Sequence, residues 1–500
     1  MRRFQLNAVL FIIVLVNGNQ AFPQAIGIFD GHTDVGHILH PGNATYNPST
    51  GIYMVSGSGG NIWFNNDEFH YLWKKMAGNF ILQARGKFTG KGTEKHRKFG
   101  WMVRSSPDSS ASMVAAVIHG DGLTSLQYRK LPKTDVNETK FSMSAPDVIQ
   151  LEKRGNLFIM SAAHFGEPFV AEQVLDADMP GNVYVGLFVC SHNKEIKETA
   201  TFDNVRIIIP AKDSLVAYHE YIGSCLETLD IFTGKRRVLY TSAESLQAPN
   251  WTSDAKSLLY NSNGSVFRYN IRDKKLHLIN TGLVKNNNND HVISFNGKML
   301  GLSSSSKDGK YNSVVYTVPI NGGSPKQITP EGPSYLHGWS PDARYLTFTG
   351  ERNGEFDVYK IPVDGGPEIR LTSSPGLDDG PEYSPDGKYI YFNSVRSGMM
   401  QLWRMKPDGS QQQQLTNDEF NNWFPHVSPD GKWIVCLSFM KDIPPGDHPF
   451  YKHVYLRLLP VNGGTPKVIA YLYGGQGSIN TPSWSPDSKK IAFVSNSNIK

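Results

Sequence analysis

Three histidines stand close before a repeated Ser-Pro-Asp triplet in the C-terminal half of this 500-residue sequence. His291 and His337 each lie three residues before the triplet in consecutive repeats, and His426 lies two residues before it in a later one. Neutral imidazoles that converge on one axis can hold a divalent metal ion. We therefore name these histidines as candidate metal ligands, with a divalent metal as the only cofactor that the sequence suggests. The alternative is that they bond to neighbouring backbone groups.

Polar and aromatic residues near the same triplets have the chemistry of a carbohydrate site. A sugar presents an array of hydroxyls and one apolar ring face, so its site needs hydrogen-bonding side chains and an aromatic ring. The candidates ahead of the triplets are Asp290, Asp378, Asp379, Glu382, Asn421, Asn422, Trp423 and Asn480, and those from other loops of the repeats are Glu351, Arg352 and Arg396. Solvation of an exposed rim is the alternative explanation.

One loop is much longer than its counterparts. The step from one triplet to the next is 44 residues in two successive repeats and 57 residues in the last. An elaborated loop in a regular array is more often functional than decorative. We expect its Tyr451 to contact a ligand, and its His448 to act as an acid or base with Tyr451 or Lys452. A glycosidase would instead need two facing carboxylates, for which Asp379, Glu382 and Asp447 are the candidates.

The triplet itself is turn chemistry. In "SPDGK" the proline presets φ, the aspartate bonds a neighbouring amide, and the glycine takes positive φ without steric cost. Six such units, each long enough for four short strands, predict a six-bladed β-propeller over 211–500 that is closed by strands from both ends. In such a ring the strand before each triplet is innermost, and its first residues lie at one mouth of the channel. The units begin their triplets at Thr252, Ser294, Ser340, Ser384, Ser428 and Ser485.

These units resemble the TolB-type propeller repeat, most strongly at "SPDGKYIYF" and "SPDGKWIVC". Oligogalacturonate lyases are built on a similar propeller with a histidine-held metal. That resemblance implies a metal-assisted polysaccharide lyase, in which His291, His337 and His426 would hold the ion.

The region 26–210 has a different pattern. Short runs such as "GNFILQARGKF" and "KFGWMVRSS" alternate apolar and polar residues between Gly, Asn and Asp turns, which predicts strands with one buried face. Some ten such strands suit a two-sheet β-sandwich. The segment resembles the concanavalin-like, laminin-G-type modules of secreted bacterial carbohydrate-active proteins. Such modules most often bind or pack.

The first 25 residues read as a secretory signal peptide, because Arg2 and Arg3 precede a short apolar run that ends in small and polar residues. We therefore expect a secreted or extracytoplasmic protein, in the periplasm or at the cell surface, without a transmembrane segment after signal removal. A membrane anchor is the alternative. Three cysteines, an odd number, support neither a disulfide framework nor a zinc knuckle. A formal net charge of +5 without a basic cluster gives no case for nucleic acid.

Two functions fit the all-β organisation. The first is a recognition protein that binds a glycan, another polymer or a protein partner at the propeller mouth and the sandwich, and we expect it to be a monomer. The second is a carbohydrate-active enzyme, either a metal-assisted lyase or a glycoside hydrolase, with its site at the same mouth. A structural role in envelope assembly is the third and least favoured interpretation.

Overall fold

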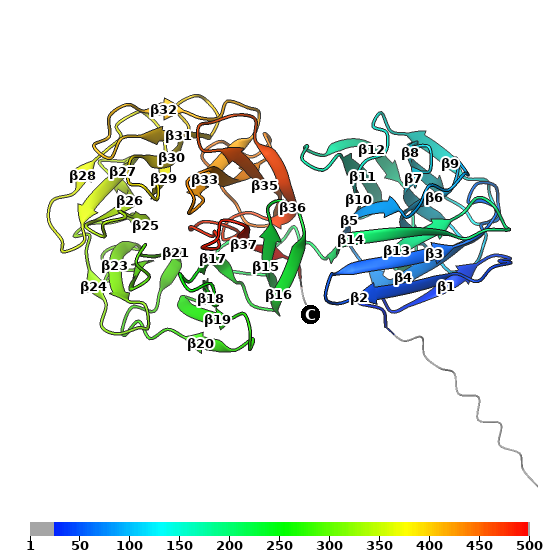
Figure 1. Ribbon diagram of the computed structural model, residues 1–500, viewed down its shortest axis with the longest axis horizontal. Coiled ribbons are helices and arrows are strands. Elements are labelled where there is room, and N and C mark those ends of the chain that lie inside the picture. The colour runs from blue at the N-terminus through cyan, green and yellow to red at the C-terminus, as the bar shows by residue number, and fades with distance from the viewer. Residues whose placement is uncertain (1–24, 499–500) are drawn as a thin grey trace, which may run out of the picture.

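The computed structural model describes residues 25–498, without the side chains of 172–174, as two all-β bodies side by side (Figure 1). The fold class predicted from the sequence, a two-sheet sandwich followed by a six-bladed propeller, is confirmed. Over this described range the chain forms no helix with the length and apolarity needed to cross a bilayer. The predicted signal peptide lies outside the described residues, apart from its last position.

The N-terminal body consists of two seven-stranded antiparallel sheets. The first sheet has the order β1 (Gly31–Val35), β4 (Phe69–Ala77), β13 (Asn182–Cys190), β6 (Lys98–Arg104), β7 (Met113–His119), β8 (Thr124–Arg129) and β9 (Asn137–Lys140). The second has the order β12 (Val170–Asp176), β11 (Leu157–Ala163), β10 (Val148–Arg154), β5 (Phe80–Phe88), β14 (Glu198–Ile208), β3 (Ile52–Gly57) and β2 (Asn43–Asn47). Fourteen strands exceed the ten expected, because edge strands such as "NATYN" and "NETK" are too polar to alternate.

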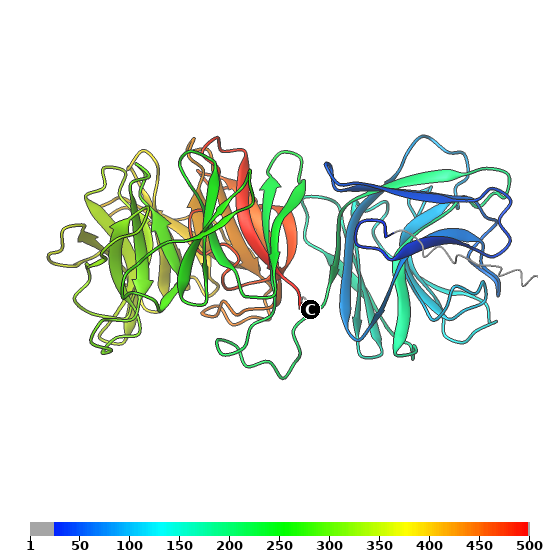
Figure 2. The same cartoon turned by 90° about the horizontal axis from the view of Figure 1, so that it is seen from below.

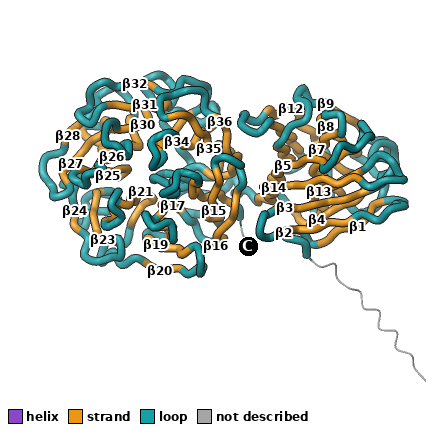
Figure 3. Tube along the Cα trace, viewed as in Figure 1, coloured by secondary structure: helices purple, strands orange, loops and turns teal. Residues whose placement is uncertain are grey.

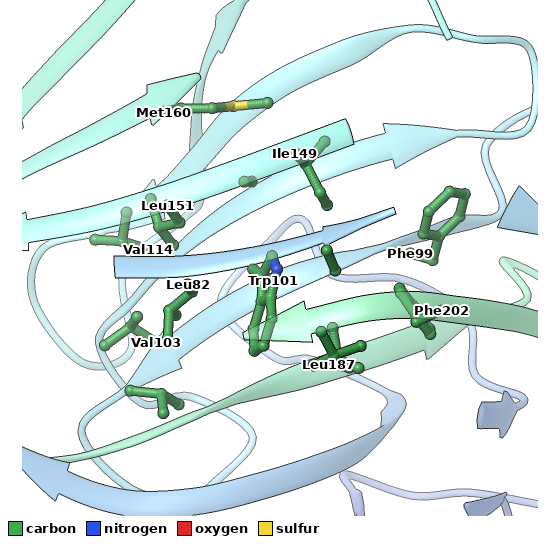
Figure 4. Packing of buried hydrophobic residues seen from close by; sticks show 14 of the residues in the cluster. Leu82, Phe99, Trp101, Val103, Val114, Ile149, Leu151, Met160, Leu187 and Phe202 are labelled. Carbon is green, nitrogen blue, oxygen red and sulfur yellow. The ribbon is translucent and has the colours of Figure 1, made fainter. Parts of the chain in front are cut away.

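The sandwich core follows the period of two along its strands. In β6, Phe99, Trp101 and Val103 point between the sheets, and Trp101 is fully buried. Figure 4 shows Trp101 among side chains from both sheets, including Leu82 and Leu187. The alternation that predicted these strands thus reflects one face packed against the facing sheet.

The propeller consists of six sheets around a channel, with the strand before each triplet innermost (Figure 1). Blade 1 is built from both ends of the repeat region, with β15 (Ser224–Asp230) between β16 (Arg236–Ser242) and β37 (Lys490–Asn496), so the predicted closure is confirmed. Blade 2 is β17 (Gln247–Trp251), β18 (Ser257–Ser262), β19 (Ser265–Asn270) and β20 (Leu276–Leu278). Blade 3 is β21 (Asn287–Ile293), β22 (Met299–Ser304), β23 (Val314–Pro319) and β24 (Lys326–Gln327).

The other three blades have the same four-stranded order. Blade 4 is β25 (Ser334–Trp339), β26 (Tyr345–Arg352), β27 (Glu355–Pro362) and β28 (Ile369–Arg370). Blade 5 is β29 (Asp378–Tyr383), β30 (Ile390–Ser394), β31 (Gln401–Met405) and β32 (Gln413–Gln414). Blade 6 is β33 (Asn421–Val427), β34 (Trp433–Phe439), β35 (Lys452–Pro460) and β36 (Lys467–Gly474).

The triplet forms the turn that its residues predict. Ser384 Oγ donates to Asp386 Oδ1 at 2.7 Å and accepts from the amide of Tyr389 at 3.0 Å, while the same aspartate oxygen accepts from the amide of Lys388 at 3.1 Å. Gly387 has a φ of 71°. The turn therefore joins the inner strand of a blade to its second strand, at the end of the blade opposite to the start of the inner strand.

The sandwich packs against blades 1 and 6 of the propeller (Figure 3). Tyr455 Oη accepts from the amide of Phe169 at 2.9 Å, and Tyr471 Oη donates to the carbonyl of Glu167 at 2.7 Å. The segment between β14 and β15 projects past one face of the propeller (Figure 2), where its Ile222 packs with residues of the overlong loop. This segment therefore reaches the face on which the inner strands begin.

Candidate functional site

A cavity of about 700 Å³ lies at the mouth of the channel where the inner strands begin. Blades 2 to 6, the segment before β15, the overlong loop and the stretch 476–480 all contribute to its wall. The propeller mouth predicted from the sequence is thus a real concavity. Five of the residues singled out in the sequence line it, namely Asp290, His337, Asp379, His448 and Asn480.

Amides and aromatic rings make up most of the cavity wall. The amide side chains are those of Gln247, Asn261, Asn263, Asn287, Asn288, Asn289, Gln476 and Asn480. The aromatic side chains are those of Tyr218, Tyr221, Tyr335, Phe356, Phe424 and Phe450. Neither Lys nor Arg occurs among the described residues of this wall, so apart from the hydroxyls of its tyrosines its titratable groups are Asp290, His337, Asp379 and His448.

Asp379 is held by one of its two carboxylate oxygens. Its Oδ1 accepts from Thr349 Oγ1 at 2.6 Å and from the amide of Gly380 at 2.7 Å, and lies 3.2 Å from His337 Nε2. Within residues 25–498 no hydrogen bond is formed to Oδ2. Burial would raise the pKa of Asp379, but the charge and hydrogen bond of His337, with a weaker contribution from Thr349, hold it far below its usual range.

A bulge in β29 sets the position of this carboxylate. The pairing register with β30 shifts between Asp379 and Glu382, and Gly380 adopts a φ of 67°. A Cβ at position 380 would lie 2.7 Å from Asn393 Oδ1, so glycine suits both the conformation and the space. The bulge lets the amide of Gly380 turn back onto Asp379.

His337 lies beside Asp379 on the neighbouring blade. Burial lowers the pKa of His337, but the hydrogen bond and charge of Asp379 outweigh burial and leave it above the usual value. The two side chains therefore form a buried ion pair within the cavity wall. Its Nδ1 is buried and forms no hydrogen bond of normal geometry.

Asp290 is the second carboxyl group in the cavity. Only 6% of the residue is exposed, and among the described residues its carboxyl group has no hydrogen-bond partner. The pKa of Asp290 is raised to about 7, mainly by burial; the charge of His337 opposes this rise and the charge of Asp379 adds to it. Near neutral pH the cavity thus contains one ionised carboxylate, that of Asp379, and one carboxyl group, that of Asp290, whose raised pKa favours its protonated form more than water would.

The overlong loop between β34 and β35 contributes Gly446, His448 and Phe450 to the wall, as its length predicted. The His448 ring packs edge-on against Trp423, with 4.4 Å between ring centroids. Burial lowers the pKa of His448, although the charge of Asp379 opposes this effect. His448 is therefore mainly neutral near pH 7. Tyr451 and Lys452, the residues expected to act with it as acid or base, are not part of the cavity wall.

The three candidate metal ligands do not share a site. His426 Nδ1 lies 2.6 Å from Glu382 Oε2, and its Nε2 lies 2.6 Å from the carbonyl oxygen of Ile479, so both ring nitrogens are engaged. His291 is fully buried outside the cavity wall, where burial lowers its pKa to about 4. Across residues 25–498, no three His, Cys, Asp or Glu side chains are grouped so that they could hold a metal. The metal interpretation therefore has no support in this geometry.

Several other candidates are placed away from the cavity. Trp423 is 0% exposed, so its ring cannot stack on a sugar, and Tyr451 Oη accepts from the amide of Ile222 at 3.1 Å. Asn421 binds the carbonyl of Ile443 at 2.8 Å and thereby anchors the overlong loop. These three residues were expected to bind a ligand, but the Trp423 ring is buried and the polar groups of Tyr451 and Asn421 bond to neighbouring segments instead.

The charged candidates from the loops stabilise the blades instead. Arg396 Nη2 lies 2.7 Å from Asp378 Oδ2, and Arg352 Nη2 lies 2.8 Å from Glu368 Oε1. Neither pair lines the cavity, nor do Glu351, Asn422 and the exposed Asp447. Glu382 lies at the opposite end of the channel, beside a smaller cavity of about 270 Å³. Of the three carboxylates proposed for a glycosidase, only Asp379 is therefore in the site.

A simple register would have found more of the site. The fifth residue before each triplet lines the cavity in five of the six blades, namely Gln247, Asn289, Tyr335, Asp379 and Asn480. The exception is Trp423, where Phe424 at the next position, with a φ of 57°, takes its place. The third residue before the triplet, where His291 and His337 stand, is proline in the other four blades and gives less information about the cavity. Tyr218 and Tyr221 carried no repeat signal, because they lie in the connection between the domains.

Comparisons with known proteins agree with this architecture. The family model of the TolB β-propeller domain matches residues 330–443. The uncharacterized protein Atu1656 of Agrobacterium fabrum is 42% identical over 272 residues, which is 54% of this chain and 92% of that protein. A solved structure from Agrobacterium tumefaciens that carries a provisional TolB name is 41% identical, with a TM-score of 0.54, over 56% of this chain and all of its own. TolB from Acinetobacter baumannii is 18% identical, with a TM-score of 0.41, over 51% of this chain and 64% of its own.

Proposed function

This chain belongs to the TolB β-propeller family, and we propose that it recognises a neutral or amino-bearing glycan in the cavity at the propeller mouth. The Agrobacterium relatives described above have no assigned role, so the proposal depends on the site itself. The observation that carries this proposal is the cavity wall. It combines eight amide side chains with six aromatic rings and contains no Lys or Arg among its described residues.

The chemistry of the wall suits a sugar chain. Amides both donate and accept hydrogen bonds, as sugar hydroxyls require, and aromatic rings pack on the apolar face of a sugar ring. The side-chain amide of Asn289 and the hydroxyl of Tyr335 have no partner among the described residues, so both are available to a ligand. A volume of about 700 Å³ is within the range of pockets that enclose small organic ligands.

The charges of the wall favour some glycans over others. Asp379 is ionised, and the lining offers no fixed cation other than the paired His337. A uronate, a phosphate or a nucleic acid would bring a second negative charge to a buried carboxylate, which is unfavourable. A neutral sugar or an amino sugar avoids this repulsion, so we expect those classes to bind in preference to acidic polysaccharides.

The N-terminal sandwich has a supporting role in this proposal. We propose that it is a concanavalin-like module and that it binds a further part of the same polymer or attaches the propeller to its surroundings. We also propose that the protein is secreted or extracytoplasmic, at the cell surface or in the periplasm, and that it is a monomer. A protein partner at the mouth is the alternative occupant.

The replacement Tyr335→Ala is expected to weaken glycan binding by about 10-fold or more, because cavity aromatics dominate binding energy at such sites. The measurement is calorimetric titration of the full chain with neutral, amino-bearing and uronate-containing oligosaccharides. Phe295→Ala is the matched control, since Phe295 is an exposed aromatic residue beside the smaller cavity at the other end of the channel. Its affinity should equal that of the wild type.

Two results would contradict this function. One is preferential binding of uronate oligosaccharides, which would mean that the charge argument fails. The other is an equal loss of affinity in Tyr335→Ala and Phe295→Ala, which would place binding outside the mouth cavity. If no oligosaccharide binds, the glycan proposal fails and the protein-partner alternative takes its place.

A further inference from the structure

We propose that the cavity hydrolyses a glycosidic bond of the glycan that it binds, with Asp290 as the general acid and Asp379 as the general base. This inference rests on the proposed function, since the same cavity must first bind the glycan. It adds an activity that recognition does not need. Asp379 has one carboxylate oxygen without a hydrogen bond, the carboxyl group of Asp290 has no hydrogen-bond partner among the described residues, and His337 on the intervening blade interacts with both.

Asp379 is held in place through one carboxylate oxygen, and the other oxygen is free of hydrogen bonds from the described residues. All three of its protein contacts reach Oδ1, from Thr349, Gly380 and His337. A purely structural carboxylate in a buried position tends to engage both oxygens, as Asp67 does with two arginines in the sandwich. In Asp379 the second oxygen is left for a water molecule, and the charge of His337 keeps the group ionised.

Asp290 is the second carboxyl group of the cavity and is not used by the protein. Its carboxyl group is nearly buried, lines the cavity, and has no hydrogen-bond partner among residues 25–498. Its oxygens border the cavity, so a ligand or water in the cavity can supply the hydrogen bonds that the protein does not. The charged and titratable groups that act on it are His337, Asp379 and the hydroxyl of Tyr335. Burial raises its pKa to about 7, and the charge of Asp379 helps this rise while the charge of His337 opposes it.

Asp290, His337 and Asp379 follow one another on adjacent blades of the ring. Asp290, His337 and Asp379 come from the inner strands of blades 3, 4 and 5, so the two carboxyl groups flank a blade whose histidine interacts with both. Two carboxyl groups whose environments push their pKa values apart are the arrangement that glycoside hydrolysis requires. His337 is a positioning residue here, because it acts through Asp379.

The reaction balances with water as the only co-reactant. Asp290 gives its proton to the glycosidic oxygen as the bond from that oxygen to the anomeric carbon breaks. Oδ2 of Asp379 takes a proton from a water molecule whose oxygen forms a new bond to the anomeric carbon. Asp379 then returns its proton to solvent and Asp290 regains one, so the net change is one water consumed and two sugar hydroxyls formed.

The test uses the full chain and the neutral and amino-bearing oligosaccharides that it binds, with new reducing ends as the readout. Asp290→Asn and Asp379→Asn are each expected to lower kcat by about 100-fold or more, which is the usual effect of removing a general acid or base. Asp447→Asn is the control, because Asp447 is an exposed carboxylate of the overlong loop outside the cavity wall.

The pH profile separates a catalytic role from a structural one. In the wild type, kcat/KM should fall as pH rises through about 7, because the acid must be protonated. Asp290→Asn should abolish that falling limb, whereas a variant that is merely less stable would keep its shape. Thermal melting of each variant identifies those that fail to fold, and Asp379→Glu then retests the base with its carboxylate retained.

The outcomes distinguish the two proposals. If the wild type binds sugars but releases no reducing ends, the hydrolysis is overturned and recognition stands. If Asp290→Asn and Asp379→Asn retain wild-type kcat, the hydrolysis at this pair is overturned even where sugars are cleaved. If nothing binds, the proposed function fails as well.

Discussion

Glu227→Gln is expected to lower the free energy of unfolding of the propeller by about 3–5 kcal/mol, the usual cost of breaking a buried ion pair from one side. Glu227 is fully buried in β15. Its Oε2 lies 2.6 Å from Arg206 Nη2 of the sandwich, and its Oε1 lies 2.6 Å from Arg236 Nη2 of β16. Ser495 of β37 donates to Oε1 at 2.5 Å. One carboxylate therefore joins both edges of the closing blade to the other domain.

The pH dependence has a definite sign. Burial would raise the pKa of Glu227, but Arg206 and Arg236 outweigh burial and lower it from 4.5 to about 2. Since the folded-state pKa is below the unfolded value, the stabilisation is complete above about pH 4.5 and is lost as the pH falls to about 2. Denaturant unfolding of the wild type and Glu227→Gln should thus differ near pH 7 and converge near pH 2.

Glu355→Gln is the control for this prediction. Glu355 is an exposed glutamate at the start of β27, and its replacement should change the free energy of unfolding by less than about 0.5 kcal/mol. A difference of less than about 1 kcal/mol between Glu227→Gln and the wild type near pH 7 would contradict the view that this group secures the closure.

Asp67→Asn should destabilise the sandwich by about 3–5 kcal/mol while leaving the affinity of the mouth cavity for short oligosaccharides unchanged. Asp67, Arg104 and Arg129 are each 0% exposed at their side chains. Arg104 Nη1 and Arg129 Nη2 both lie 2.7 Å from the Asp67 carboxylate, so its loss leaves two buried guanidinium groups without a counter-charge. The measurements are hydrogen exchange of β6 to β8 and calorimetric titration with the sugar.

Asp135→Asn gives the comparison, since Asp135 is an exposed aspartate of the same body. It should alter neither quantity. If Asp67→Asn leaves the hydrogen exchange of β6 to β8 unchanged, the ion pairs of Asp67 with Arg104 and Arg129 contribute no stability. If it abolishes sugar binding while the propeller stays folded, the site is not confined to the propeller mouth.

The repeat was readable from the sequence because its turn is local. Ser384, Asp386 and Gly387 form their turn with bonds that span only a few residues, so the same letters give the same turn in each blade. Six such turns at similar spacing leave little choice other than a ring of six blades. The alternation in β6 predicted a strand for the same reason, since a period of two needs no distant partner to be recognised.

The candidate site was predicted less well, because bulges decide which residues face the channel. Every inner strand of blades 2 to 6 shifts its pairing register along its length. In β29 Asp378 and Asp379 both precede the shift and point to opposite sides of the strand, so Asp379 lines the cavity while Asp378 pairs with Arg396. A bulge exists only relative to the partner strand, so adjacent aspartates look equivalent in the sequence.

The sequence by itself determined that this protein is all-β, that a ring of six blades presents its inner strands at one mouth, and that one long loop lies at that mouth. Only the tertiary structure decided that Asp290 and Asp379 share a cavity, that Trp423 is buried, and that tyrosines of the interdomain segment complete the wall. Turns and alternation are set by neighbouring residues. Burial, charge pairing and cavity shape depend on contacts between segments far apart in the chain.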